Sequence, residues 1–156
     1  MTEALLAELR LLRDERDITR TLYAYGHTLD YGDEAGFIDC WTEDAMLWWP
    51  GPGEMRGHEA LRKGFRAHTH APELFHKHLV MAPMITIDGD TATVASMMAR
   101  LDPYDGMPAI RAYGRYLDKL RRCADGKWRI CERIPEVEGW RKGEVPSASA
   151  ARPPGT

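Results

Sequence analysis

Several sequence features that mark large classes of protein are missing from this chain. Its 156 residues carry a net charge of −3, without the basic excess expected of a nucleic-acid-binding domain. Apolar runs such as residues 79–84 are short, whereas a membrane span needs ~18 residues. The nucleotide-binding patterns GxGxxG and GxxxxGKS/T and the nucleophile pattern GxSxG do not occur. We therefore expect no nucleic-acid, membrane or nucleotide partner.

Cysteine is scarce, with three residues in the chain. Cys40, Cys123 and Cys131 show no CxxC spacing of a metal site, and their odd number does not fit a disulfide framework. They suit a reduced, cytoplasmic interior. Residues 1–17 place acidic residues among the leucines, without the uninterrupted apolar core of a secretory signal.

What the sequence does contain is a helical first half and a strand-rich second half. Apolar residues at helical spacing, such as Ile18, Leu22 and Leu29, predict helices, and alternating apolar residues predict strands. The predicted helices span residues 5–30, 33–41 and 57–68, and the predicted strands span residues 45–50, 74–88, 91–102, 108–122 and 127–134. Helices gathered before a run of antiparallel strands indicate an α+β domain.

This order predicts one domain over residues 1–143, with three N-terminal helices packed in a curved, mostly antiparallel sheet. A sheet that wraps the helices would form a cone with an internal pocket. Pro83 within a predicted strand indicates a bulge or a sheet edge, and residues 50–57 read as turns. Residues 144–156, rich in Pro, Ser and Ala, are expected to be a disordered tail.

Residues 108–122 alternate clearly between two faces. Ile110, Ala112, Tyr116 and Leu120 share one face, which only Asp118 interrupts. The opposite face is rich in Arg and Lys, which argues against a purely apolar interface between subunits.

Histidines are concentrated before and within the long predicted strand that follows the third helix. His76 and His78 share a strand face, either as half-buried imidazoles bonded to main-chain carbonyls or as parts of a site. With His68 and His70 they form two HxH units, which could supply ligands for zinc or iron. The spacing matches no specific ligand motif, so we predict no metal and no other cofactor.

Asp30 ends the first predicted helix while its apolar stripe is still running. It shares a helical face with Tyr23 and His27. The carboxylate is either a solvated group at the helix end or a partner for the histidines.

Four segments together carry a family resemblance: TLYAYGHTLDYGD, a Trp followed by GHEALRKGF, HKHLVMAPMITIDGDTATV, and GRYLDKLRRCADGKWRI. Over residues 14–141 the chain resembles the SnoaL-like branch of the nuclear transport factor 2-like superfamily, which implies a cone-shaped α+β barrel. Within it the chain is similar to scytalone dehydratase, bile-acid 7α-dehydratase and hexachlorocyclohexane dehydrochlorinase. That similarity implies a cofactor-free enzyme with an Asp–His pair inside the cone.

The resemblance also implies catalytic roles for particular residues. The family's aspartate falls on Asp30, and its histidine falls on His78 rather than on His76. Two further catalytic positions fall on Tyr25 and Arg133. These four residues are the expected catalytic group.

Other matched positions concern substrate binding. An inward polar position falls near Tyr116, and Asp102 lies near the place of a second histidine of scytalone dehydratase, which argues against a scytalone-type substrate. The expected substrate-binding side chains are Tyr23, Trp48, Trp49, His76, Met98 and Tyr116.

Two of these assignments conflict with simple periodicity. Helical spacing puts Tyr23, not Tyr25, on the face of Asp30, so Tyr25 would need a bend in the helix. Strand alternation puts Arg133 with Cys131, opposite the apolar positions of that strand. Arg133 would then reach a cavity only if the cavity lay on that face.

Together these residues predict a cofactor-independent lyase or isomerase for a hydrophobic cyclic or aromatic small molecule, with dehydration by β-elimination as the specific expectation. His78 would act as general base, worth ~10²–10⁴-fold, and the adjacent Asp30 should raise its pKa. The alternatives are a non-catalytic small-molecule-binding protein and a structural β-type subunit of an aromatic-ring dioxygenase. We expect a homo-oligomer, either a dimer or a trimer.

Overall fold

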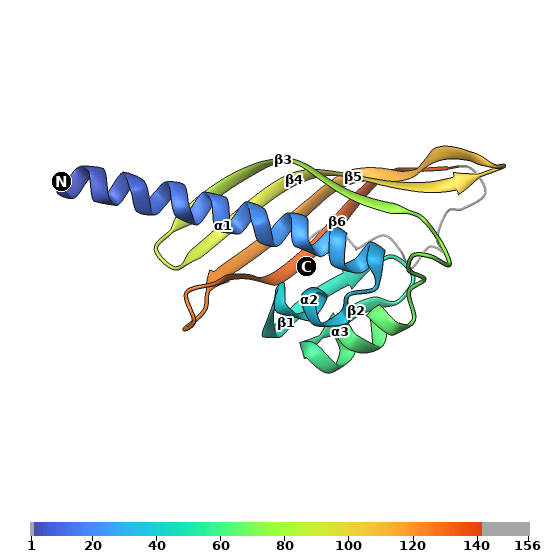
Figure 1. The fold of residues 1–156 in the computed structure, drawn as a ribbon, viewed down its shortest axis with the longest axis horizontal. Coiled ribbons are helices and arrows are strands. Elements are labelled where there is room, and N and C mark those ends of the chain that lie inside the picture. Colours follow the sequence, from blue (N-terminus) through green and yellow to red (C-terminus); the bar gives the residue numbers. More distant parts are fainter. Residues whose placement is uncertain (1, 142–156) are drawn as a thin grey trace.

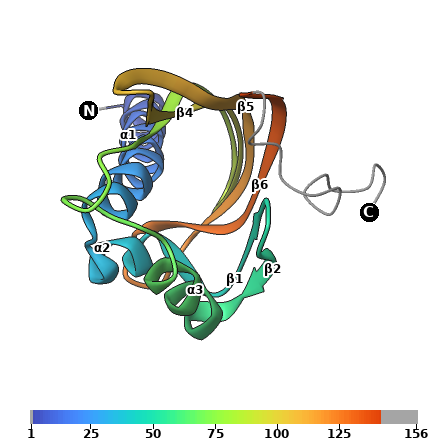
Figure 2. The ribbon, with the colours of Figure 1, turned by 90° about the vertical axis from the view of Figure 1, so that its right-hand side faces the viewer.

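Six strands form one curled sheet, and α1 lies along its concave side (Figures 1 and 2). The computed structural model describes residues 2–141. Its helices are α1 (Glu3–Tyr31), α2 (Glu34–Asp39) and α3 (Gly57–Arg66), and its strands are β1 (Trp41–Trp49), β2 (Gly53–Arg56), β3 (Lys77–Asp88), β4 (Thr91–Tyr104), β5 (Met107–Arg122) and β6 (Trp128–Trp140). The strand order is β2-β1-β6-β5-β4-β3, with β1 and β6 parallel and the other pairs antiparallel. The predicted α+β class is confirmed, although β2 and β3 do not close the sheet into a barrel.

Helix α1 buries the stripe that its sequence predicts. Ile18, Leu22 and Leu29 are completely buried, and α1 contacts β3 and β6. The first turns extend past the sheet (Figure 1) and leave leucines such as Leu5 and Leu12 exposed. The C-terminal half of α1 is therefore the part that contributes side chains to the interior.

Strand β3 is an edge strand with a bulge, as Pro83 predicted. Its pairing with β4 shifts between Met81 and Met84. A bulge changes which side chains face inward, so Val80 and Ile85 both pack against the core although they are five positions apart, an odd spacing that strict alternation would place on opposite faces.

Strand β6 contains a second bulge, which corrects the predicted orientation of Arg133. The pairing of β5 with β6 shifts register beyond Leu120 and Ile130, leaving Cys131 as the extra residue on β6. Ile130 and Arg133 are consequently both completely buried on the inner side. Strict alternation would have placed them on opposite faces.

Other boundaries differ from the prediction. Strand β2 lies within the stretch interpreted as turns, and β1 already begins at Trp41, where a helix was expected. Ile110 is 55% exposed, because a register shift in the β4–β5 pairing removes it from the face of Ala112. The predicted tail at residues 144–156 lies outside the described residues. Between residues 2 and 141, no helix is long and apolar enough to cross a membrane.

Candidate active site

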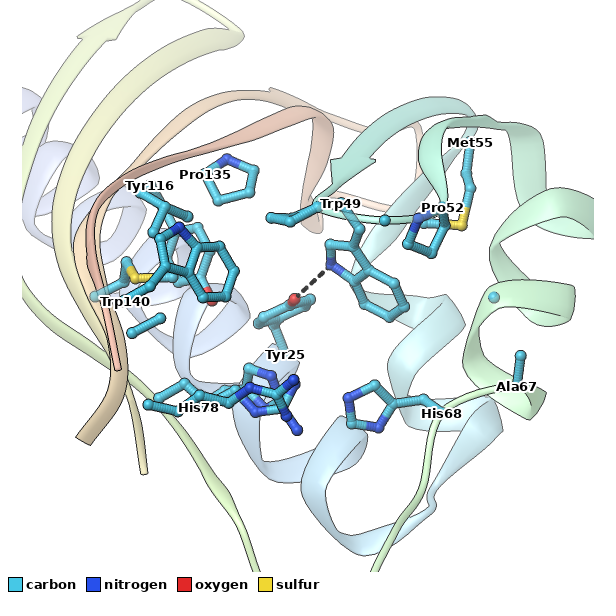
Figure 3. Close-up of a pocket in the computed structure, with 18 of the residues that line it drawn as sticks. Tyr25, Trp49, Pro52, Met55, Ala67, His68, His78, Tyr116, Pro135 and Trp140 are labelled. Atoms are coloured by element: carbon cyan, nitrogen blue, oxygen red, sulfur yellow. Dashed lines mark hydrogen bonds between the residues drawn. The ribbon is translucent and has the colours of Figure 1, made fainter. Parts of the chain in front are cut away.

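The concave side of the sheet holds a cavity of about 690 Å³. Aromatic side chains from four elements line it, namely Tyr25 from α1, Trp49 from β1, Tyr116 from β5 and Trp140 from β6 (Figure 3). His78 joins the wall from β3. A concave, mostly apolar space of this size accommodates a small organic molecule.

Asp30 and His78 form a hydrogen-bonded pair at this wall. Nδ1 of His78 lies 2.6 Å from Oδ1 of Asp30, and the main-chain N–H of His78 donates to Oδ2 at 2.9 Å. The two side chains are only 4% and 9% exposed. Because Nδ1 is engaged by the carboxylate, Nε2 is the nitrogen left to accept a proton.

Gly26 allows β3 to come close enough to α1 for this pair to form. A Cβ atom at Gly26 would lie 2.5 Å from the main-chain oxygen of His78. In the loop between α3 and β3, the main-chain N–H of Ala71 donates to the main-chain oxygen of Asp30 at 2.9 Å. The end of α1 is thus fixed against both β3 and the loop that leads into it.

The carboxylate of Asp30 is held in its ionised form. Burial alone would raise its pKa, but the close contact with His76 and the hydrogen bonds from His78 outweigh burial and hold the pKa far below the usual range. Nε2 of His76 lies 3.3 Å from Oδ1, a longer contact than that of His78. His76 is 1% exposed and lies beside Asp30. It was expected to bind substrate, but it does not line the cavity.

The raised pKa predicted for His78 is wrong. Burial lowers the pKa of this imidazole below its usual value and outweighs the opposing hydrogen bond to Asp30. The positive charge of Arg100 lowers it further. The ring is therefore neutral near pH 7, with a lone pair available, as a general base requires.

Tyr25 lines the cavity beside the dyad, whereas Tyr23 does not line it. The ring of Tyr25 is 1% exposed and its centroid is 6.4 Å from that of His78, whereas Tyr23 is 43% exposed. Helix α1 is unbroken, and its buried face includes both Tyr25 and Asp30, so the expected bend is unnecessary. Nε1 of Trp49 donates to the hydroxyl of Tyr25 at 3.2 Å.

Arg133 lies beneath two tyrosines and does not line the cavity. Its Nε and Nη2 donate to the two oxygens of Asp118, each at 2.7 Å, and both side chains are fully buried. The guanidinium lies 4.2 Å from the ring centroid of Tyr25 and 4.3 Å from that of Tyr116. Burial is the main cause that raises the pKa of both tyrosines, so their hydroxyls remain protonated donors. Asp118, which interrupted the apolar face of its strand, is thus the partner of a buried arginine.

The other expected substrate-binding residues divide between cavity and exterior. Met98 and Trp49 line the cavity. Trp48 does not, because successive side chains of a strand point to opposite faces.

Comparison with known proteins agrees with this architecture. A model of the SnoaL-like domain matches residues 10–134. The chain belongs to the SnoaL-like family. A search of curated proteins finds no match.

Solved structures similar to this SnoaL-like protein cover most of its length. An NTF2-like protein with a cystatin-like fold from Novosphingobium aromaticivorans is 26% identical, with a TM-score of 0.78 over 94% of this chain and 92% of that one. A variant of Rv3472, a function-unknown protein from Mycobacterium tuberculosis, is 28% identical, with a TM-score of 0.74 over 88% and 77%. A Novosphingobium aromaticivorans protein provisionally named a scytalone dehydratase is 22% identical, with a TM-score of 0.73 over 100% and 99%. At that identity the last likeness supports the fold alone.

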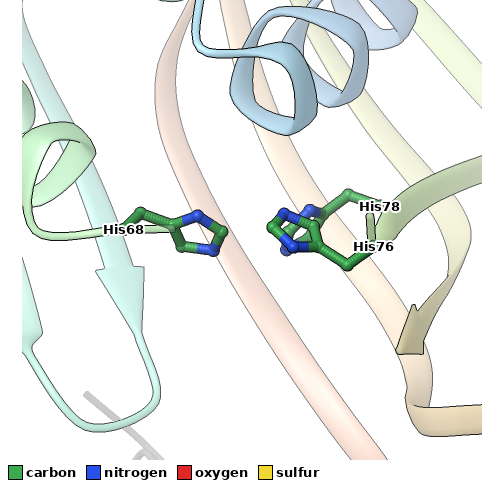
Figure 4. A group of neighbouring side chains, drawn as sticks. All are labelled: His68, His76 and His78. Carbon is green, nitrogen blue, oxygen red and sulfur yellow. The ribbon is translucent and has the colours of Figure 1, made fainter. Parts of the chain in front are cut away.

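Three imidazoles of this SnoaL-like domain meet beside the cavity. His68, His76 and His78 each bring a ring nitrogen within 4.8 Å of the others (Figure 4). Tetrahedral zinc with bonds of ~2.0–2.1 Å places its ligand nitrogens about 3.4 Å apart, so the rings would have to close around an ion. Burial lowers the pKa of His68 to about 3, which keeps it neutral and able to act as a ligand or an acceptor.

Sequence reasoning missed the charged residues of the cavity wall, which are Lys63, Arg111 and Arg100. Arg100 is the one that pairs with His78. It lies on β4 directly opposite His78 on β3. Its Nε donates to Asp102 at 2.8 Å, and Arg111 donates to the other oxygen of the same carboxylate at 2.8 Å. Strand alternation could have predicted the position of Arg100, because it lies two residues after Met98 and so faces the same side of the sheet.

Proposed function

We propose that this SnoaL-like protein is a cofactor-independent lyase or isomerase for a hydrophobic small molecule. The observation that carries the proposal is the buried hydrogen bond of 2.6 Å between Asp30 and His78 at the wall of the cavity. A carboxylate bonded to Nδ1 fixes the tautomer of the imidazole and stabilises the imidazolium once it forms. A protein that only binds a ligand or supports another subunit has no need of this arrangement.

The specific reaction that we propose is dehydration by β-elimination. Nε2 of His78 removes a proton from a carbon next to a carbonyl group. The electron pair of the broken C–H bond forms the new C=C bond, and the hydroxyl group on the β-carbon departs. The imidazolium returns the proton to that hydroxyl, which leaves as water, so His78 ends the reaction neutral and no co-reactant is consumed.

Two tyrosines are placed to stabilise the developing oxyanion. Tyr25 and Tyr116 line the same cavity as His78, and their raised pKa keeps their hydroxyl groups protonated. Arg133 acts through them, since its guanidinium lies against both rings and adds positive charge behind the hydroxyls. One preorganised donor of this kind is worth ~10²–10³-fold in rate.

The test is a screen of cyclic β-hydroxy ketones, followed by the ultraviolet absorbance of the conjugated enone. Wild type should form the enone, and His78→Gln should be slower by about 10²–10⁴-fold. Asp30→Asn should also be slow, and its His78 pKa, measured by NMR titration, should fall below the wild-type value because the favourable carboxylate is lost.

His58→Gln provides the matched control. His58 contacts the main-chain oxygen of Trp41 and lies outside the cavity, so the rate should be unchanged. Equal rates in wild type and His78→Gln would contradict the proposed base. If no C–H acid in the screen loses a proton, judged also by deuterium exchange in D₂O, the protein is a binding or structural member of the family instead.

A further inference from the structure

Arg100 gives the cavity a positive end next to the proposed base. The residue pairs directly with His78 across β3 and β4, and directly with Ala112 across β4 and β5. Side chains of directly opposed residues lie on the same face of a sheet. Trp140 continues this row on β6, and all four residues line the cavity.

The charge of Arg100 is only partly compensated. Asp102 offers it one carboxylate oxygen, since the other oxygen accepts from Arg111. In the described part of the chain, Arg100 makes this one hydrogen bond through Nε, and its two Nη groups make none. Its side chain is 21% exposed.

The rest of the cavity wall adds to the imbalance. Lys63 of α3 and Arg111 of β5 are further cations at the wall, and among residues 2–141 no carboxylate lines the cavity. The positive charge of Arg100 also acts on its neighbours, because it lowers the pKa of both His68 and His78. A guanidinium in an apolar cavity favours a ligand that supplies an anion.

We propose that Arg100 binds an anionic group of the ligand, and that the natural ligand is a hydrophobic acid whose carboxylate or similar oxyanion lies beside His78. The apolar body of the molecule then extends along the row toward Trp140. One part of this inference rests on the proposed function, namely that the carbon that loses a proton to His78 lies near the anionic group of the substrate. The binding preference itself does not depend on turnover.

Two fluorescent probes with the same ring system test this preference. 8-Anilino-1-naphthalenesulfonate carries a sulfonate, and N-phenyl-1-naphthylamine lacks it. In wild type the sulfonate should bind more tightly and displace the neutral probe. In Arg100→Gln the affinity for the sulfonate should fall by about 10- to 100-fold, the typical value of a charge-assisted hydrogen bond, while the affinity for the neutral probe should remain.

Two further variants separate a local contact from general effects of charge and folding. Arg100→Lys keeps the positive charge and should retain most of the preference for the sulfonate. Arg115→Gln makes the same change of charge on an exposed side chain paired with Glu136, and should bind both probes as wild type does.

The outcomes are distinct. An unchanged sulfonate affinity in Arg100→Gln, or an equal loss for both probes, overturns the assignment, because the first means no contact and the second a damaged cavity. A sulfonate preference that depends on Arg100 supports it even if His78→Gln has no effect on any reaction, in which case the proposed function alone fails. The reverse pattern, with turnover dependent on His78 but no anion preference, rejects only the role of Arg100.

Discussion

The contact between Gly26 and β3 offers a sensitive test of how the dyad is assembled. Gly26→Ala adds one methyl group to α1 at the point where the helix meets the main chain of His78. The new Cβ would lie 2.5 Å from the main-chain oxygen, whereas ordinary van der Waals contact begins at 3.4 Å. Since the neighbour is main chain, β3 must move by about 0.9 Å, from 2.5 Å to at least 3.4 Å.

That displacement is large compared with the tolerance of the site. The main-chain hydrogen bond from His78 to Asp30 is 2.9 Å long and would exceed the usual range of ~2.7–3.2 Å if it absorbed the movement. A misplacement of about 1 Å can reduce a rate by about 10²-fold. Overpacking costs about 1–3 kcal/mol, and the better helix propensity of Ala returns about 1 kcal/mol. We expect a net loss of up to about 2 kcal/mol, or a melting temperature lower by about 4–8 °C.

The assay is thermal unfolding together with proton NMR of the His78 Nδ1–H resonance, which should weaken or shift as the contact with Asp30 lengthens. Gly64→Ala is the matched control, because its Cβ would meet the sulfur of Met55, a flexible side-chain end that can move away. It should leave the His78 signal unchanged. A Gly26→Ala protein with wild-type stability and a wild-type His78 resonance would show that the close approach does not set the dyad geometry.

Buried charged and neutral groups lead to three further expectations. Asp118→Asn leaves the guanidinium of Arg133 without an ionised partner and should lower the free energy of unfolding by about 3–5 kcal/mol, measured by urea titration, while the double variant Asp118→Leu with Arg133→Met should lose less. The free energy of unfolding should also fall below about pH 6, by up to about 1.4 kcal/mol per pH unit for each histidine that burial keeps neutral. The pKa of folded His68, about 3, is below its unfolded value, so the unfolded chain takes up the proton first, and a flat profile between pH 7 and pH 4 would contradict this. Zn²⁺ should inhibit any turnover that depends on His78, and EDTA should restore it, because an ion bound by His68, His76 and His78 would occupy the base.

The α+β class and most elements could be predicted because local periodicity encodes them. Ile18, Leu22 and Leu29 mark the buried stripe of α1, and Pro83 marks the bulge at the sheet edge. The contact between Asp30 and His78 could not be predicted from local periodicity. No local pattern relates residues 48 positions apart, so this pairing came from the resemblance to a family and not from the periodicity.

The inner surface of β6 could not be predicted, because alternation holds only as far as a bulge. One extra residue at Cys131 reverses the facing of the residues from Glu132 to Val137, including Arg133, and a second register shift after Val137 reverses it again. The prediction of a raised pKa for His78 was wrong for another reason. Sequence reasoning counted the carboxylate of Asp30 but not the degree of burial or the charge of Arg100, and burial is the larger cause.

The buried pair of Asp118 and Arg133 also has an evolutionary consequence. Losing one partner removes a large part of a typical stability of ~5–15 kcal/mol, so we expect selection against single substitutions at either position. We expect the two tyrosines that contact Arg133 to be inherited together with this pair. The cavity residues on the β1–β2 connection, such as Pro52, carry no such dependence. New substrate preferences among descendants of this chain should arise there first.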